Sequence, residues 1–232
     1  MRKWFAVLLN LSIIALLVTA CASHNNGDGG SAGGVLPIAT PSPTPASLFT
    51  TAQIEGVYQT DCVSFDGYYT KKVFSLTREP NDSTNTKMAA SINVQKYYQA
   101  GCLAASSQEL LSVTVSAELI LGERVIGQNW HKIDNQVFSV VAALDDSQVV
   151  RDFNSTKECG FSDWTFNPKT VTGQFCQFLG GQQLAQNQIV YDILSRDATT
   201  GNLTMGIDTT SKTSDGNRPT QLSSTVFKVR TQ

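Results

Sequence analysis

The sequence predicts an all-β domain of about ten antiparallel strands, arranged as a closed barrel or as a two-sheet sandwich. Apolar and polar residues alternate with period two in many short segments, whereas helical periodicity is weak. Turn-forming residues separate the segments, and such short connections favour antiparallel pairing because parallel pairs need crossovers of a dozen or more residues. Cysteines spaced along the same region allow two disulfides.

The chain starts with the features of a secretory signal peptide. Arg2 and Lys3 precede an apolar run from Trp4 to Val18, and Val18-Thr19-Ala20-Cys21 ends it with small residues before a cysteine. The run is short for a membrane span, which needs about 20 residues. The segment resembles a bacterial lipoprotein signal, which implies that residues 1–20 are removed and that Cys21 is lipidated.

The lipidation expected at Cys21 makes the membrane a partner of this protein, through acyl chains rather than a spanning helix. Ala22-Ser23 follows, without an aspartate at the second mature position, and this resembles lipoproteins sent to the outer membrane. The alternative is plain secretion with Cys21 in a disulfide, but that would leave one of the 5 cysteines unpaired.

Residues 21–46 have the composition of a tether. Asn25 to Gly34 is rich in glycine and serine, and Thr40 to Pro45 alternates proline with small polar residues. The first stretch is flexible and the second favours extended polyproline geometry, so neither forms a core. Residues 47–232 are long enough for a single domain with a substantial core.

The clearest strand is Ser112 to Leu119, in which Val113, Val115, Ala117 and Leu119 would share an inner face. Met88, Ala90, Ile92 and Val94 repeat this pattern. The other candidates are Gly56 to Asp61, Tyr69 to Thr77, Gln136 to Leu144, Gln148 to Phe153, Val171 to Phe178, Gln188 to Ser195, Leu203 to Asp208 and Val226 to Arg230. A short helix is expected over Ala104 to Leu111.

Turns are expected where glycine, asparagine, aspartate and proline cluster between the candidate strands. Asp66-Gly67 lies between the first two, Glu79 to Ser83 between the second and third, and Thr199 to Asn202 between two later ones. Glycine and asparagine tolerate positive φ, and proline cannot donate to a central ladder. These positions suit hairpins.

Cys62, Cys102, Cys159 and Cys176 remain once Cys21 is set aside. The simplest pairing is Cys62–Cys102 with Cys159–Cys176, although two other pairings remain open. The close CxxC pairs of a zinc site are absent from the sequence, so we expect disulfides and no metal.

Gly56-Val57-Tyr58-Gln59-Thr60-Asp61-Cys62 resembles the start of a lipocalin chain, where a glycine and an aromatic residue open the first barrel strand. Tyrosine here stands in place of the usual tryptophan. Lipocalins also carry an arginine near the last strand that covers this aromatic residue. The resemblance therefore implies a lipocalin-like barrel in which Arg218 or Arg230 stacks on Tyr58.

Residues for common catalysis are missing or solitary. His131 is the sole histidine of residues 47–232, and Asp145-Asp146 falls where aspartate is an ordinary turn former. The sequence lacks nucleotide-binding and hydrolase motifs. A net charge of −2 with 16% charged residues does not suit nucleic-acid binding. We expect a protein that is not an enzyme and uses no cofactor.

Aromatic residues are spread over nearly every candidate strand, and those that point inward would line or fill a barrel. We expect a small apolar ligand or lipid to bind there, with Tyr58, Trp130, Trp164 and Arg218 as candidate contacts. The alternative is a structural or adhesive module with a solid core that binds an envelope protein or a glycan.

Overall fold

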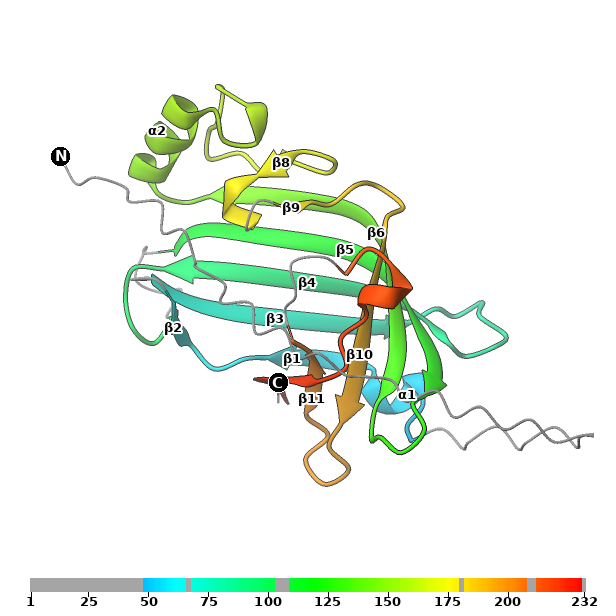
Figure 1. Ribbon diagram of the computed structural model, residues 1–232. Coiled ribbons are helices and arrows are strands. Elements are labelled where there is room, and N and C mark those ends of the chain that lie inside the picture. Colours follow the sequence, from blue (N-terminus) through cyan, green and yellow to red (C-terminus); the bar gives the residue numbers. More distant parts are fainter. Residues whose placement is uncertain (1–47, 66–67, 103–108, 180–181, 208–211, 231–232) are drawn as a thin grey trace, which may run out of the picture. The chain divides into compact units, whose positions relative to one another are not determined.

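The computed structural model describes residues 48–65, 68–102, 109–179, 182–207 and 212–230. Cys21, the expected signal peptide, the expected tether and most of the expected helix at Ala104 to Leu111 lie outside them. Residues 43–232 form one compact unit (Figure 1). Among the described residues, no helix combines the length and apolarity needed to cross a bilayer.

The described residues form two α-helices, three short 3-10 helices and twelve strands. The helices are α1 (Thr51–Ile54), α2 (Ser147–Thr156), η2 (Glu158–Gly160), η3 (Gln177–Leu179) and η4 (Asp215–Asn217). The strands are β1 (Gly56–Gln59), β2 (Val63–Phe65), β3 (Tyr68–Arg78), β4 (Lys87–Tyr97), β5 (Glu109–Arg124), β6 (His131–Leu144), β7 (Lys169–Thr170), β8 (Phe175–Cys176), β9 (Gln182–Gln183), β10 (Ile189–Arg196), β11 (Leu203–Gly206) and β12 (Leu222–Val229).

The main sheet closes into an antiparallel barrel. Ten strands belong to this sheet, and β2 and β7 are side additions to β3 and β6, which leaves eight strands in the ring. The ring runs β1-β3-β4-β5-β6-β10-β11-β12 in chain order and closes because β1 pairs with both β3 and β12. The all-β barrel, the strand number of about ten and the antiparallel pairing are therefore confirmed, and the sandwich alternative is wrong.

Period two places one set of side chains inside the barrel, as expected from the sequence. Directly opposed residues of an antiparallel pair share a face, and Ile92 of β4 lies opposite Val115 of β5. Met88 and Leu119, at the far end of the same two strands, are also opposed and are fully buried. The inner faces predicted for β4 and β5 are confirmed.

One end of the barrel is packed solid, and we call it the closed end. Phe49 and Ile54 enter from the α1 region and join Phe74, Leu119 and Leu203 in a buried cluster. Arg196 ties α1 to this end by donating from Nε to the Gln53 carbonyl oxygen at 3.0 Å. The opposite end, where β4 finishes and β5 begins, is called the mouth end.

Residues 145–188, between β6 and β10, form a segment that we call the roof segment (Figure 1). The strand predicted over Gln148 to Phe153 is wrong, because these residues belong to α2. Asp146 caps this helix by accepting hydrogen bonds from the backbone N–H groups of Gln148 and Val149, at 2.7 and 3.0 Å. Val149, Val150 and Phe153 then pack against a second buried cluster at helical spacing.

The strand predicted over Val171 to Phe178 is also wrong for most of its length. Only Phe175–Cys176 is extended there, paired with β9, and the chain then turns into η3. The short β7 lies just before it and extends the pairing of β6 at Val141 and Ala142. The roof segment is therefore built from short pieces rather than long strands.

Candidate ligand cavity

The barrel encloses a cavity of about 900 Å³ between the closed end and the roof segment. Most of its lining is apolar, from seven barrel strands and the roof segment. The apolar lining residues are Val63, Phe74, Ala90, Ile92, Val94, Leu111, Val113, Val115, Ala117, Val137, Phe178, Leu179, Leu184, Val190, Met205 and Phe227. Small-molecule sites of proteins have volumes of about 300–1,000 Å³ and similar linings.

Burial along the inner faces shows that this half of the barrel is hollow. Ile92, Val94 and Val115 point inward yet keep part of their surface accessible, whereas Met88 and Leu119 have 0% exposure at the closed end. Eight-stranded barrels lie at the size where the interior is either filled or holds one small ligand. Here the closed half is filled and the mouth half is not.

The cavity reaches the surface at the mouth end. Val63 of β2 lines it and has 53% of its surface exposed, and the lining residues Gln183 and Thr213 are exposed as well. A ligand could therefore enter without unfolding the barrel strands.

The roof segment contributes the apolar residues Phe178, Leu179 and Leu184 to the lining. Phe178 stacks on Phe153 of α2 at 5.5 Å between ring centroids. Trp164 lies behind them with its indole Nε1 donating to the Glu158 carbonyl oxygen at 3.0 Å. The aromatic rings thus hold Phe178 in place from the side away from the cavity.

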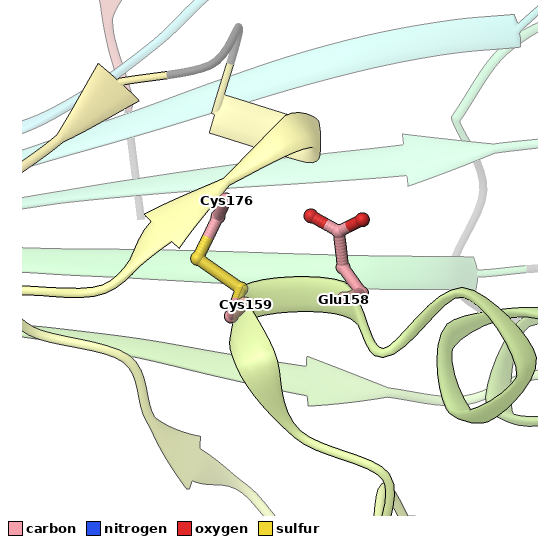
Figure 2. A group of neighbouring side chains, drawn as sticks. All are labelled: Glu158, Cys159 and Cys176. Atoms are coloured by element: carbon pink, nitrogen blue, oxygen red, sulfur yellow. A yellow bond between two sulfur atoms is a disulfide. The ribbon is translucent and has the colours of Figure 1, made fainter.

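The disulfide at Cys176 and the carboxylate of Glu158 hold η3 in place. Cys159 and Cys176 are joined with 4.4 Å between their Cα atoms, and Figure 2 shows Glu158 beside this bridge. The Glu158 Oε1 atom accepts hydrogen bonds from the backbone N–H groups of Gln177 and Phe178, at 2.5 and 3.3 Å. The cavity-lining turn is therefore anchored both covalently and electrostatically.

Glu158, Cys159 and Cys176 also place their ligand-type atoms within 4.8 Å of one another (Figure 2). Both sulfurs are consumed by the disulfide, so they offer no thiolate to a metal. The second disulfide joins Cys62 to Cys102. The simplest pairing expected from the sequence is confirmed.

A buried ion pair forms part of the cavity wall. The Lys212 Nζ atom donates to Oδ2 of Asp192 at 2.8 Å, and the two side chains are 10% and 5% exposed. The backbone N–H groups of Ile193 and Gly206 donate to Oδ1 at 2.8 and 3.1 Å. Burial raises the pKa of the Asp192 carboxyl above its usual range, and the Lys212 ammonium opposes that rise.

Gly206 is required beside this ion pair because no Cβ fits there. A Cβ at this position would lie 2.5 Å from Oδ1 of Asp192 and 2.6 Å from the Cβ of Pro219. Such a close approach explains a glycine at the end of β11.

The structure places none of the four residues expected to bind ligand in the cavity lining. Tyr58 is buried in the closed-end cluster, Trp130 precedes β6 at the same end, and Trp164 supports the roof segment from behind. Arg218 does not stack on Tyr58 but lies over the Tyr191 ring, 5.0 Å from its centroid.

Arg218 instead joins the segment after β11 to two barrel strands. Its Nη1 atom donates to the carbonyl oxygens of Ile133 and Asp192, both at 2.7 Å, and Nη2 pairs with Asp134 at 2.6 Å. Arg230 is exposed, and its backbone N–H donates to the Val57 carbonyl oxygen. The arginine whose charge acts on Tyr58 is Arg196.

His131, the sole histidine of residues 47–232, is a buried structural residue. Its Nδ1 lies 2.9 Å from the Gly122 carbonyl oxygen, and Nε2 accepts from the Leu48 N–H at 3.1 Å. Only the neutral tautomer with a proton on Nδ1 satisfies both contacts. Phe49 packs edge-on against the ring at 4.6 Å. These contacts leave both ring nitrogens engaged in holding the chain before α1.

Sequence reasoning missed the polar lining residues of the cavity. Lys72 of β3, Lys96 of β4 and Asp192 of β10 occupy inward positions of strands that were expected. Extending the parity of Ile92 and Val94 by one step would have placed Lys96 inside.

The sequence matches no protein-family model and no curated protein. The geometry of the cavity therefore carries the functional argument.

Proposed function

We propose that this protein is a non-enzymatic lipoprotein of the bacterial envelope, anchored through Cys21, that binds a small apolar ligand or lipid inside its barrel. The observation that carries the proposal is the apolar cavity of about 900 Å³ with an exposed mouth. A solid core would have favoured the structural or adhesive alternative, and the mouth half of this barrel is not solid.

The apolar lining supports binding because burial of apolar surface contributes about 25 cal/mol of favourable free energy per Å² removed from water. The anchored roof segment supports a preformed site. Phe178 lies two residues after Cys176, which is fixed by its disulfide, and its ring stacks on Phe153. A preformed pocket loses less conformational entropy when the ligand enters.

The first experiment asks whether a small molecule occupies the cavity. We expect the full chain, purified from envelopes in detergent, to release a stoichiometric apolar compound on solvent extraction and to bind a fluorescent naphthylamine probe. Val115→Trp would place an indole inside the cavity and weaken both signals, because Val115 lines the cavity. Ser116→Trp on the same strand is the matched control, since Ser116 pairs outside the cavity with Ser91 and Ser139.

Absence of an extracted compound together with absence of probe binding in the unsubstituted chain would overturn the binding proposal. Equal loss in the Val115→Trp and Ser116→Trp variants would also count against it, because the outward tryptophan leaves the cavity intact.

The second experiment concerns the anchor. We expect the unsubstituted chain to incorporate a labelled fatty acid, as the signal ending in Val18-Thr19-Ala20-Cys21 suggests. We also expect it to fractionate with the outer membrane, as Ala22-Ser23 suggests. Cys21→Ser should lose the label. Recovery of an unlabelled native chain in the soluble periplasmic fraction would remove the anchoring part of the proposal and leave the cavity argument standing.

A further inference from the structure

Four hydroxyl side chains lie on one wall of the cavity. They come from three strands that are neighbours in the ring, because β1 pairs with both β12 and β3. We define this hydroxyl wall as Thr60, directly after β1, Thr70 of β3, and Ser223 and Thr225 of β12. Val63 lies opposite Thr70 and marks the exposed rim of the cavity. The hydroxyl groups of the barrel strands are therefore concentrated on one side.

The pairing of β1 with β3 makes the hydroxyl wall continuous on that side. Thr60 and Lys72 exchange hydrogen bonds, because the Thr60 N–H donates to the Lys72 carbonyl oxygen and the Lys72 N–H donates to Thr60 Oγ1, both at 2.9 Å. Thr70 lies two residues from Lys72, at the next inner position of β3. Thr60 and Thr70 are therefore diagonal neighbours on the inner face.

The pairing of β1 with β12 extends the hydroxyl wall in the other direction. Gln59 lies opposite Lys228, so Thr60 is level with the residue before Lys228. Thr225 and Ser223 follow at successive inner positions of β12. Inner positions of one strand are about 7 Å apart and neighbouring strands about 5 Å, so the wall covers about 7 Å along the strands and about 10 Å across them.

The hydroxyl wall retains hydrogen-bonding capacity. Thr60 and Ser223 each accept from one backbone N–H, at 2.9 and 3.0 Å, and their hydroxyl protons can still be donated to a ligand. The hydroxyls of Thr70 and Thr225 make no hydrogen bond to any residue that the structure describes. A polar group left facing hydrocarbon costs free energy, so this wall favours a ligand with polar groups of its own.

The other polar groups of the described lining are engaged within the protein. The lining lysines and Thr213 each have an interaction partner, and Asp192 pairs with Lys212. Asn135 and Gln183 donate from their amide groups to backbone carbonyl oxygens, at 3.5 and 2.7 Å. Capacity for new neutral hydrogen bonds is therefore found mainly on the hydroxyl wall.

An apolar wall lies across the cavity from β12. The ring leads from β12 to β5 through β1, β3 and β4 in one direction and through β11, β10 and β6 in the other, so the two strands face each other. The cavity-lining residues of β5 are all apolar, and they are Leu111, Val113, Val115 and Ala117. Ile92 of β4 and Val137 of β6 flank them. The cavity is therefore polar on one long side and apolar on the opposite side.

We infer that the cavity takes a facial amphiphile, which is a ligand with hydroxyl groups along one long face and hydrocarbon along the opposite face, as in a hydroxylated polycyclic lipid. The inference rests on the proposed function, because it names the ligand class of the same cavity. A rigid ring system keeps its hydroxyls on one face without loss of conformational entropy. A linear amphiphile, with its polar group at one end, would leave most of the hydroxyl wall facing hydrocarbon.

The test measures binding of cholate, cholanate and palmitate to the full chain, Thr70→Val, Thr225→Val and the double variant, all in one detergent. Cholate and cholanate share their ring system and carboxylate side chain, but only cholate carries ring hydroxyls, all on one face. Valine keeps the shape of threonine and removes the hydroxyl. The measured quantity is the ratio of cholate to cholanate affinity in each protein. Partitioning of each probe into micelles is common to all variants and cancels between them.

Two further variants serve as controls. Thr204→Val removes a hydroxyl outside the cavity, because Thr204 lies opposite Val226 and does not line the cavity. Thr225→Ser keeps a hydroxyl at a wall position. We expect each valine substitution on the wall to lower the cholate-to-cholanate ratio about two- to tenfold, the size of one neutral hydrogen bond. Palmitate affinity should change by less than about twofold, and both controls should match the unsubstituted chain.

An unchanged ratio in the double variant, or an equal fall with Thr204→Val, would overturn this inference. So would a failure of cholate and cholanate to bind an unsubstituted chain that still binds the naphthylamine probe, with apolar ligand binding left intact. Loss of the naphthylamine signal as well, with no extracted compound, would instead overturn the proposed function. A circular-dichroism spectrum that matches the unsubstituted chain shows that each variant has folded. A misfolded valine variant would be replaced by Thr→Ala, for which the same ratio applies.

Discussion

The ion pair between Asp192 and Lys212 yields the sharpest stability prediction. Lys212→Met would leave the Asp192 carboxylate, whose side chain is 5% exposed, without its ammonium partner. Removal of one member of a buried pair typically costs about 3–5 kcal/mol. Because Ile193 and Gly206 would still donate to the carboxylate, we expect a loss of about 3 kcal/mol, near the lower limit of that range.

Asp192→Asn should cost less than Lys212→Met. Burial already raises the pKa of Asp192, which means that its ionised form is not fully compensated inside the protein. The asparagine oxygen can still accept from Ile193 and Gly206, so we expect a loss of about 1 kcal/mol. The double variant should lose about 2 kcal/mol, which gives a coupling energy of about 2 kcal/mol.

The pH dependence follows from the same pKa. A folded-state pKa above the ordinary value of 3.8 means that the folded chain binds the proton more tightly than the unfolded chain does. Loss of Lys212 raises the Asp192 pKa further. The stability deficit of Lys212→Met should therefore shrink as the pH falls through the raised pKa toward 3.8. The double variant lacks the Asp192 carboxyl, so its deficit relative to the unsubstituted chain should not shrink in this range.

The assay is urea denaturation of the four chains at pH 7 and at mildly acidic pH, without reductant. The double-mutant cycle cancels whatever else either side chain contacts. Additive free energies of unfolding would refute the coupling. A Lys212→Met deficit that stays constant or grows on acidification would refute the reasoning from the Asp192 pKa.

Three further predictions concern single features of the fold. Gly206→Ala should cost about 1–3 kcal/mol in urea denaturation, because its Cβ would lie 2.5 Å from Asp192, whereas Gly216→Ala meets no atom within 4 Å and should be neutral. The carboxyl of Asp82, which accepts hydrogen bonds from Thr84, Thr86 and Lys87, should titrate by NMR near its lowered pKa of about 2, and a midpoint at the ordinary 3.8 would contradict the turn geometry. Replacing Cys159 and Cys176 by serine should cost about 3 kcal/mol, and replacing Cys62 and Cys102 about 4 kcal/mol, because the second loop is longer; equal urea midpoints for both variants and the unsubstituted chain would contradict this.

The barrel strands could be predicted from the sequence because alternation depends only on which face points inward. Residues such as Val115 and Ile92 are apolar whether the interior is packed or hollow. The alternation therefore indicated the inner face but not the cavity. Phe49 and Ile54 fill the closed end from outside the barrel strands, and their placement depends on tertiary packing that alternation does not encode.

The roof segment was predicted poorly for a different physical reason. Val149 and Phe153 are four residues apart and Asp146 can cap a helix, and both features are typical of α2. The helix is short, however, and its two valines favour a strand, so the segment was predicted as a strand. The aromatic residues misled the site prediction in a similar way. Tyr58 and Trp164 are large and apolar, and both are buried in packed clusters. The cavity is lined mostly by smaller aliphatic residues instead.

The two disulfides are related to the hollow mouth end. Cys62 follows β1 and Cys102 follows β4, both at the mouth end, and Cys176 directly precedes η3 in the cavity lining. Residues such as Ile92 and Val94 keep accessible surface there, so this half gains less free energy from apolar burial than the closed end does. Cross-links worth about 3–4 kcal/mol each offset that deficit. They are durable only in an oxidising compartment, which is where the expected lipoprotein signal would deliver the chain.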